Sequence, residues 1–222
     1  MTLLGAGKAS PADLNRALLE APILVGLDGG GDQAIKLGHT PALVTGDLDS
    51  LGAEARAHLG EGRILCTPDQ DSTDLDKALE VLPDALLLCL GVSGARLDHT
   101  LATISTLVRN PARRIVVIAE DDIVFLAPRQ MRMELAPGSR LSLFPMVPLR
   151  AESRGLEWPL DGLDLSPNGR IGTSNRVTGP VSLSVSDPGL VVLLERGAGD
   201  GAWRGENALR QAMAVMAAPT GW

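Results

Sequence analysis

The first half of this 222-residue chain alternates short apolar runs with segments of helical spacing. The clearest run, residues 85–90, is apolar throughout, which is typical of a parallel strand covered on both faces. Similar short runs end at Leu4, Leu27, Thr45, Cys66 and Ala119. Such βα repetition predicts a parallel sheet with helices packed against it.

The pattern changes after about residue 124. Polar and apolar residues alternate with period two in 131–135, 140–144 and 181–185, and Pro and Gly separate these segments. We therefore expect an α/β protein with an N-terminal Rossmann-like parallel-sheet domain, 1–126, followed by a C-terminal all-β sandwich domain, 127–222. From about residue 197 the chain continues as a C-terminal extension with a helical pattern, whose role the sequence leaves open.

Composition excludes several classes of protein. Hydrophobic residues make up 45% of the chain, enough for a substantial core, while the formal charge of −7 and the lack of a Lys/Arg run argue against a nucleic-acid surface. Cys66 and Cys89 each lie in or beside an apolar run, so we expect buried reduced thiols. The chain has no apolar stretch of membrane-spanning length and no signal-peptide pattern, and we expect a cytoplasmic protein.

Aspartates follow several of the predicted strands. The segment Gly46-Asp47-Leu48-Asp49-Ser50 comes directly after an apolar run, and two carboxylates at i and i+2 can direct oxygens at one hard cation such as Mg²⁺. Because parallel strands deliver their carboxyl ends to one edge of the sheet, we expect these side chains to converge in one crevice. The aspartates after the other strands are Asp28, Asp69, Asp71, Asp74 and Asp98. The candidate metal ligands are Asp47, Asp49, Asp71 and Asp74.

Each of these residues also has an ordinary structural interpretation. Asp71 or Ser72 could cap the helix expected from Thr73, and Arg96 could form an ion pair with Asp98. His99 could act as a general base or be a hydrogen-bonded residue at the start of a helix.

Two other features are ambiguous. Gly5-Ala6-Gly7-Lys8 lacks the third glycine of a dinucleotide fingerprint and the Ser/Thr of a P-loop, so it predicts only a strand-to-helix turn. Trp158 could fill a core that is poor in aromatic residues or contact a ligand.

Taken in chain order, six motifs resemble those of thiamine pyrophosphokinases. Four lie in the first half, namely Asp28-Gly29-Gly30, Gly46–Ser50, Thr67–Asp74 and Arg96–His99. In the second half, Gly155–Leu160 resembles the family's GLxWPL segment, and Thr173-Ser174-Asn175 resembles its STSN turn. The resemblance extends from Thr2 to about Leu194.

This resemblance implies an activity and a set of site residues. The family's members are homodimers whose α/β domain binds Mg-ATP and whose β-domain helps to bind thiamine near the subunit interface. They transfer the diphosphate of ATP to the hydroxyl of thiamine and release AMP. The catalytic residues implied here are Asp47, Asp49, Asp74, Arg96 and Asp98. The implied binding residues are Asp28, Gly29, Gly30, Gln70, Thr73 and Lys77 for Mg-ATP, and Thr173, Ser174 and Asn175 for thiamine.

The chain departs from the family pattern at Asp32, Ala95, Thr103 and Gly172. Two alternatives to the family's activity remain open. One is a Mg²⁺-dependent kinase or phosphohydrolase acting on another small alcohol or phosphate ester. The other is a catalytically silent nucleotide- or thiamine-binding protein, which a gap among the carboxylates would favour; the acidic set is complete.

Overall fold

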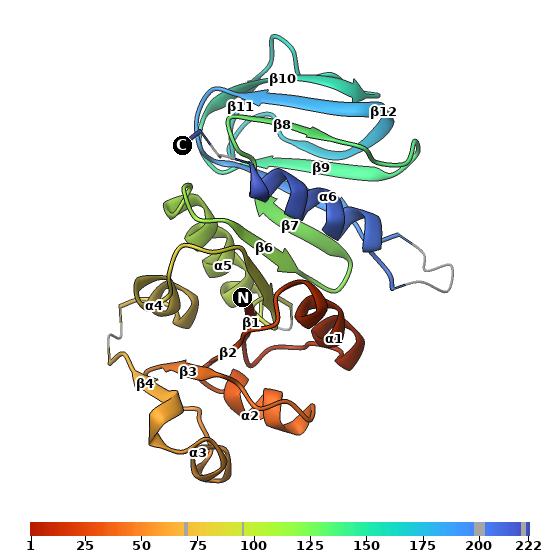
Figure 1. Cartoon of the computed structure of the whole chain (residues 1–222). Helices are drawn as coiled ribbons and strands as arrows, with labels where there is room; N and C mark the ends of the chain where they lie inside the picture. Colours follow the sequence, from red (N-terminus) through yellow and green to blue (C-terminus); the bar gives the residue numbers. More distant parts are fainter. Residues whose placement is uncertain (69–70, 95, 198–202, 219–220) are drawn as a thin grey trace. The chain divides into compact units, whose positions relative to one another are not determined.

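The computed structural model describes residues 1–68, 71–94, 96–197, 203–218 and 221–222. The fold is mixed α/β, and the chain divides into two compact units, Met1–Thr106 and Leu107–Trp222. The sequence predicted a domain boundary near residue 126. In the structure the second unit begins at Leu107, so it also contains residues 107–126. Each unit has strands of its own (Figure 1).

The first unit contains five strands in the order β5-β1-β2-β3-β4, and every pair is parallel, as the sequence predicts. Their bounds are β1 Thr2–Leu4, β2 Leu24–Leu27, β3 Leu43–Gly46, β4 Ile64–Cys66 and β5 Leu87–Leu90. Strand β5 is buried at all four positions, which agrees with its uninterrupted apolar sequence.

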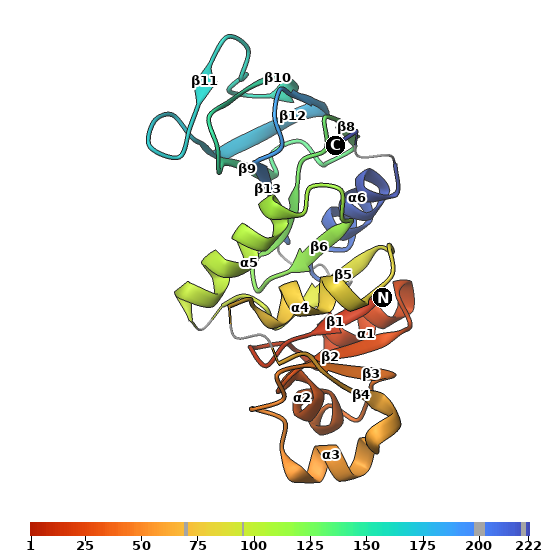
Figure 2. The same cartoon turned by 90° about the vertical axis from the view of Figure 1, so that its left-hand side faces the viewer.

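Helices connect these strands, and Figure 2 shows α2 and α3 near β3 and β4. Their bounds are α1 Pro11–Glu20, α2 Gly30–Lys36, α3 Ala53–Leu59, α4 Asp74–Val81 and α5 Leu97–Arg109, with a short 3₁₀ helix, η1, at Glu61–Arg63. Helix α1 has Ser10 as its N-cap and proline at its first position. Helix α4 is capped by Thr73, whose hydroxyl accepts the Asp76 N–H, and not by Asp71 or Ser72.

Helix α2 packs unusually close to strand β1. A Cβ atom on Gly30 would lie 1.8 Å from the Leu4 carbonyl oxygen, a distance that no side chain tolerates. The Asp28-Gly29-Gly30 segment therefore has a packing role in addition to any role in binding.

Replacing Gly30 with alanine should destabilise the first unit by about 2 kcal/mol or more, because β1 and α2 must separate to admit the methyl group. Gly62→Ala is the control, since a Cβ there has no heavy atom within 4 Å, and its effect should stay within about 0.5 kcal/mol. Urea unfolding followed by circular dichroism measures both. Equal stability of the two variants would contradict this packing.

The second unit is built on antiparallel pairs in the order β11-β10-β12-β9-β13-β7-β6, with β8 also paired to β12. Their bounds are β6 Ile115–Ile118, β7 Asp122–Leu126, β8 Gln130–Met133, β9 Arg140–Pro145, β10 Leu149–Leu156, β11 Asp164–Leu165, β12 Gly172–Val185 and β13 Leu190–Glu195. The sequence assigned 114–119 to a strand of the parallel sheet. Strand β6 pairs antiparallel with β7, since only Ala119, Glu120 and Asp121 connect the two strands.

Helix α6, Glu206–Ala217, shows what the C-terminal extension does in this fold. It contacts β6, β7 and β8 and buries Leu209, Ala212 and Met216. The second unit is therefore not all-β, because part of its core is closed by this helix.

The two cysteines differ in exposure. Cys89 is buried in β5, and burial raises the pKa of its thiol to about 12. Cys66 is exposed, so the expectation that it is buried was wrong. It ends β4, which among the described residues of the first unit pairs with β3 alone, so little of the chain covers this strand.

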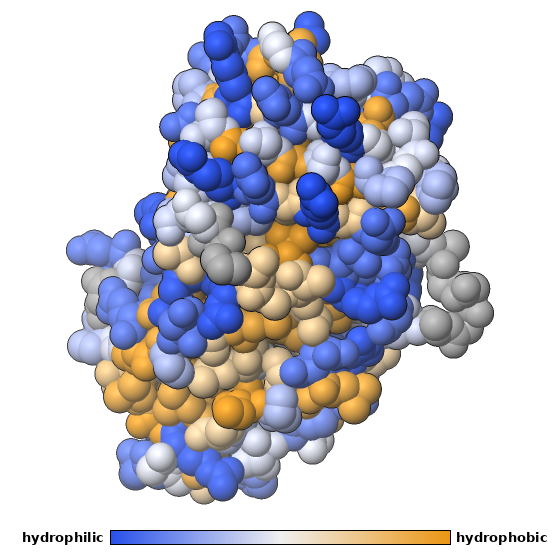
Figure 3. All heavy atoms as spheres, turned by 45° about the horizontal axis from the view of Figure 1, so that its top comes forward, coloured by the Kyte–Doolittle hydropathy of each residue, from blue (hydrophilic) through white to orange (hydrophobic). Residues whose placement is uncertain are grey.

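The surface mixes apolar with hydrophilic residues (Figure 3). Leu19 and Leu97, for example, are 79% and 73% exposed, which is ordinary for single apolar side chains. Among the described residues, no helix is both long enough and apolar enough to span a membrane.

Candidate functional site

A pocket of about 670 Å³ lies at the carboxyl ends of the first unit's strands. The loops after β1, β2, β3 and β5 line it, together with the start of α4. The predicted site residues Asp28, Asp47, Asp49, Asp74 and Arg96 all belong to this lining. Gly5 and Gly7 line it as well, so the strand-to-helix turn is part of the pocket.

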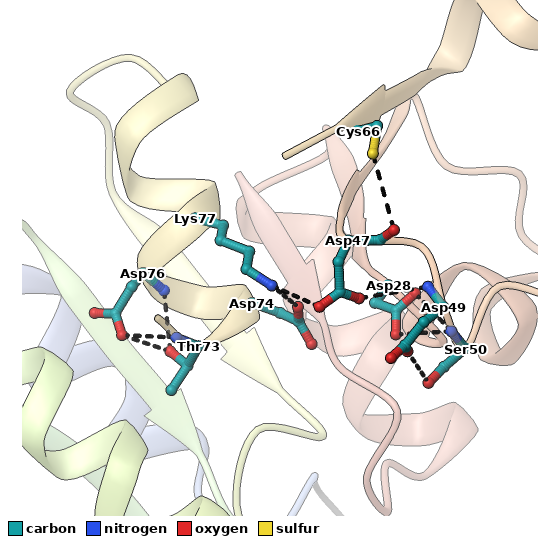
Figure 4. Close-up of polar contacts among 9 residues, drawn as sticks. All are labelled: Asp28, Asp47, Asp49, Ser50, Cys66, Thr73, Asp74, Asp76 and Lys77. Carbon is teal, nitrogen blue, oxygen red and sulfur yellow. Dashed lines mark hydrogen bonds and ion pairs between the residues drawn. The ribbon is translucent and has the colours of Figure 1, made fainter. Parts of the chain in front are cut away.

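Three carboxylates from two loops meet in this pocket. One oxygen each of Asp28, Asp47 and Asp49 lies within 4.8 Å of the other two (Figure 4). Asp28 is buried, and its carboxylate accepts the Ser50 N–H at 3.2 and 3.3 Å. This hydrogen bond ties the turn after β2 to the loop after β3.

The backbone at the end of β3 brings the carboxylates this close. Gly46 has φ +146°, and a Cβ there would lie 3.0 Å from the Asp28 Cβ and 3.2 Å from Asp74 Oδ1. Leu48, between the two aspartates of the loop, has φ +65°. A side chain at residue 46 would therefore push the acidic groups apart.

Lys77 of α4 supplies a positive charge to this acidic group. It is only 2% exposed, and its Nζ donates to Asp47 Oδ2 at 2.8 Å and lies 3.5 Å from Asp74 Oδ1 (Figure 4). Asp74 and Lys77 lie together on α4, and the buried ammonium connects this helix to the loop after β3.

Burial and neighbouring charges shift the pKa values of Asp74, Asp28 and Lys77. Burial raises the pKa of Asp74, and Asp28 and Asp47 raise it further while Lys77 lowers it. Burial also raises the pKa of Asp28, against the hydrogen bonds from Ser50. Burial alone would lower the pKa of Lys77, but its hydrogen bond to Asp47 and the charges of Asp74 and Asp47 leave it raised. The pocket thus holds carboxylates that gain from added positive charge.

The donor set of Asp28, Asp47 and Asp49 fits a magnesium ion, which prefers carboxylate oxygens. The predicted ligand set differed, since it contained Asp71 and Asp74 and omitted Asp28. Asp74 lies beside Lys77, and Asp71 is exposed and outside this group of described residues. Gln70, a predicted binding residue, lies outside the described residues.

Sequence reasoning also missed the role of Ser50 as the N–H donor to Asp28. A signal for it was present, because Asp28 begins a glycine-rich turn and Ser50 follows the paired aspartates. Of the departures from the family pattern, Asp32 accepts the Gly52 N–H at 2.8 Å and Thr103 donates to the Val92 carbonyl at 2.6 Å.

Arg96 and Asp98 form the ion pair that was their ordinary interpretation. Arg96 donates from Nε to Asp98 Oδ1 at 3.1 Å and from Nη2 to Oδ2 at 2.6 Å, and both side chains are exposed. The hydrogen bond from Arg96 lowers the pKa of Asp98. Arg96 and His99 line the pocket.

The second unit brings together its own two motifs. Asn175 is buried, and its amide bonds the backbone of Trp158, while Thr173 and Ser174 are exposed. Trp158 itself is 52% exposed. The interpretation that it fills the core was therefore wrong.

Comparison with known proteins identifies the family. Residues 14–119 match the family model of the thiamin pyrophosphokinase catalytic domain, and residues 130–190 match that of the vitamin B1 binding domain. Thiamine pyrophosphokinase 1 of Oryza sativa subsp. japonica is 30% identical over 176 residues, 71% of this chain and 67% of the rice protein. The chain belongs to the thiamine pyrophosphokinase family. Thiamine pyrophosphokinase 3 of the same species is 32% identical, over 63% of this chain and 59% of its own length.

Solved structures agree with this fold. Thiamin pyrophosphokinase from Candida albicans superposes with a TM-score of 0.76 at 19% identity, covering 87% of this chain and 88% of that one. A Lactobacillus plantarum protein superposes with a TM-score of 0.71 at 28% identity, covering 89% and 98%. At such low identity the Candida structure supports the fold alone.

The raised pKa of Asp28 gives the site a testable pH dependence. In metal-free protein the native state holds the Asp28 proton more tightly than the unfolded state, so ionisation removes stability as pH rises from about 3.8 through the raised pKa. Asp28→Asn keeps an acceptor for Ser50 and cannot ionise. Its stability relative to the parent should therefore increase across that interval and then level off.

Thermal unfolding of both proteins in EDTA at a series of pH values measures this difference. Added Mg²⁺ should raise the melting temperature of the parent more than that of Asp28→Asn, because the variant lacks one carboxylate ligand. A stability difference that does not change with pH, with equal responses to Mg²⁺, would contradict the account of the cluster.

Proposed function

We propose that this chain transfers the diphosphate of ATP to the hydroxyl of thiamine, giving thiamine diphosphate and AMP. The observation that carries the proposal is the single pocket in which Asp28, Asp47, Asp49, Asp74 and Arg96 meet, in a chain that matches both family domains. ATP is the co-substrate.

We assign the magnesium site to Asp28, Asp47 and Asp49, whose oxygens already lie close together. When bound, the ion would neutralise phosphate charge, a role that a P-loop has in other enzymes. Lys77 holds Asp47 in place from the other side. Gly29, Gly30 and Thr73 shape the neighbouring backbone, since Gly30 packs on β1 and Thr73 caps α4.

Two residues are assigned to the reacting groups. Arg96 would bind phosphate oxygens and stabilise the negative charge that develops during transfer. Asp74 would orient the thiamine hydroxyl and accept its proton, because it lines the pocket and its raised pKa makes it the better base. Asp98, whose pKa is lowered by Arg96, instead holds that guanidinium in place.

The remaining assignments follow the family resemblance. Residues 1–126 would form the Rossmann-like Mg-ATP domain and 127–222 the thiamine-binding β-sandwich domain with its extension, in a cytoplasmic homodimer with thiamine near the subunit interface. The exposed Thr173 and Ser174 would contact thiamine. Light scattering of the purified protein tests the dimer.

The test of the reaction is to incubate the protein with thiamine, ATP and Mg²⁺ and to separate the nucleotides from the thiamine species. We expect equal amounts of AMP and thiamine diphosphate, and neither product in EDTA. ADP formed without thiamine diphosphate would point to a kinase with another alcohol as its substrate. Free phosphate without thiamine diphosphate would point to a phosphohydrolase.

Asp74→Asn should lower kcat about a hundredfold or more, because the amide cannot accept the proton. Asp71→Asn is a matched control three residues away that tests the predicted ligand set. Its kcat should remain within about twofold of the parent, since Asp71 lies outside the acidic group. Steady-state kinetics measures both. A large loss in Asp71→Asn with normal turnover in Asp74→Asn would reverse the two assignments.

A further inference from the structure

Trp158 is an exposed aromatic residue whose backbone N–H and carbonyl are both hydrogen-bonded to one buried side chain. The buried Asn175 amide contacts it on both sides, since Oδ1 accepts the Trp158 N–H at 3.2 Å and Nδ2 donates to the Trp158 carbonyl at 2.6 Å. The same Oδ1 also accepts the Arg176 N–H at 2.8 Å. With 4% exposure and these three hydrogen bonds, the Asn175 side chain is committed to the protein backbone.

The indole ring is held by a second contact. The guanidinium carbon of Arg176 lies 5.8 Å from the centre of the Trp158 ring, within the range of a cation–π interaction. Arg176 Nη1 also pairs with Glu157 Oε2 at 2.9 Å, and the Glu157 N–H donates to the Arg176 carbonyl at 2.9 Å. The residue before the tryptophan and the residue after the asparagine therefore fix the ring together.

The exposed ring and the ion pair beside it contribute little to folding. Trp158 is half-exposed, and the side chains of Arg176 and Glu157 are 56% and 37% exposed, where ion pairs add little stability. What the contacts do accomplish is to restrict an exposed planar ring, which lowers the entropy lost when a ligand stacks on it.

We propose that Asn175 and Arg176 are positioning residues that hold the Trp158 indole ready for the planar rings of the substrate, and that Asn175 does not itself contact the substrate. The inference rests on the proposed function, in which thiamine is that substrate. It revises the role that the family resemblance implies for Asn175 and gives a role to Arg176, which no motif singled out. Because Arg176 pairs with Glu157, the two side chains together carry no net charge towards the cationic thiazolium ring.

The test is a thiamine titration of the full chain labelled with 5-fluorotryptophan and followed by ¹⁹F NMR, without ATP. The chain has three tryptophans, so the Trp158 signal is assigned by its loss in Trp158→Phe. In the parent we expect thiamine to shift this signal with saturation. In Arg176→Gln the dissociation constant should rise about tenfold, as the ring loses its restraint, while Arg176→Lys should recover part of the affinity.

Two controls separate positioning from charge and from general disturbance. Glu157→Gln/Arg176→Gln keeps the pair neutral and should bind as weakly as Arg176→Gln, whereas recovery of affinity in this double variant would overturn positioning. Arg150→Gln breaks an exposed pair elsewhere in the same unit, Arg150–Asp164 at 2.6 Å, and should leave the titration unchanged. In the reaction assay Arg176→Gln should raise KM for thiamine and leave kcat and KM for ATP within about twofold.

Asn175→Ala provides a second variant, and it should also weaken thiamine binding and move the Trp158 signal. Arg176→Gln decides the question if Asn175→Ala does not fold. The inference would be overturned if thiamine did not shift the Trp158 signal of the parent protein. It would also be overturned if Arg176→Gln bound thiamine with the same dissociation constant as the parent. Failure of the proposed function is a separate result: thiamine would shift the signal, but no thiamine diphosphate would form when ATP and Mg²⁺ are added.

Discussion

The buried ammonium of Lys77 is the interaction on which the candidate site depends, because it holds Asp47 and Asp74 together across two elements. Helix α4 packs against β2 and β3, and the lysine on its inner face meets the loop that follows β3. Lys77 offsets part of the negative charge gathered there. The remaining repulsion is visible in the raised pKa of Asp74, to which Asp28 and Asp47 both contribute.

The same constraint explains why the backbone of this region is unusual. Position 46 must be glycine, because a side chain there would have no room between Asp28 and Asp74. The backbone φ angles of Asp28 and Leu48 are also positive, +46° and +65°. Such conformations are disfavoured for residues other than glycine and persist where the surrounding structure holds them. Here the hydrogen bond from Ser50 to Asp28 provides that support, so the carboxylates are fixed before any cation arrives.

Much of this could be predicted from residue patterns, and the failures have local causes. Apolar runs followed by aspartates predicted a parallel sheet with an acidic edge, because strand polarity alone decides where those residues lie. Patterns along the chain predicted that Asp28 converges with Asp47 and Asp49, but not that these three carboxylates form one compact group, since that depends on the fold-back to Ser50. The exposure of Cys66 depends on its place in the last strand of the order, which pairing decides. The commitment of Asn175 to Trp158 depends on a contact between residues 17 positions apart.

Asp28, Asp47 and Asp49 are proposed to form the cation site of a pyrophosphoryl-transfer pocket. A crystal structure with Mn²⁺ and a non-hydrolysable ATP analogue, with anomalous data collected near the manganese edge, tests this assignment most directly. We expect an anomalous peak within about 2 to 2.5 Å of oxygens from these three aspartates, with the analogue's phosphates beside it. A peak held by Asp71, or a nucleotide bound away from this pocket, would contradict it.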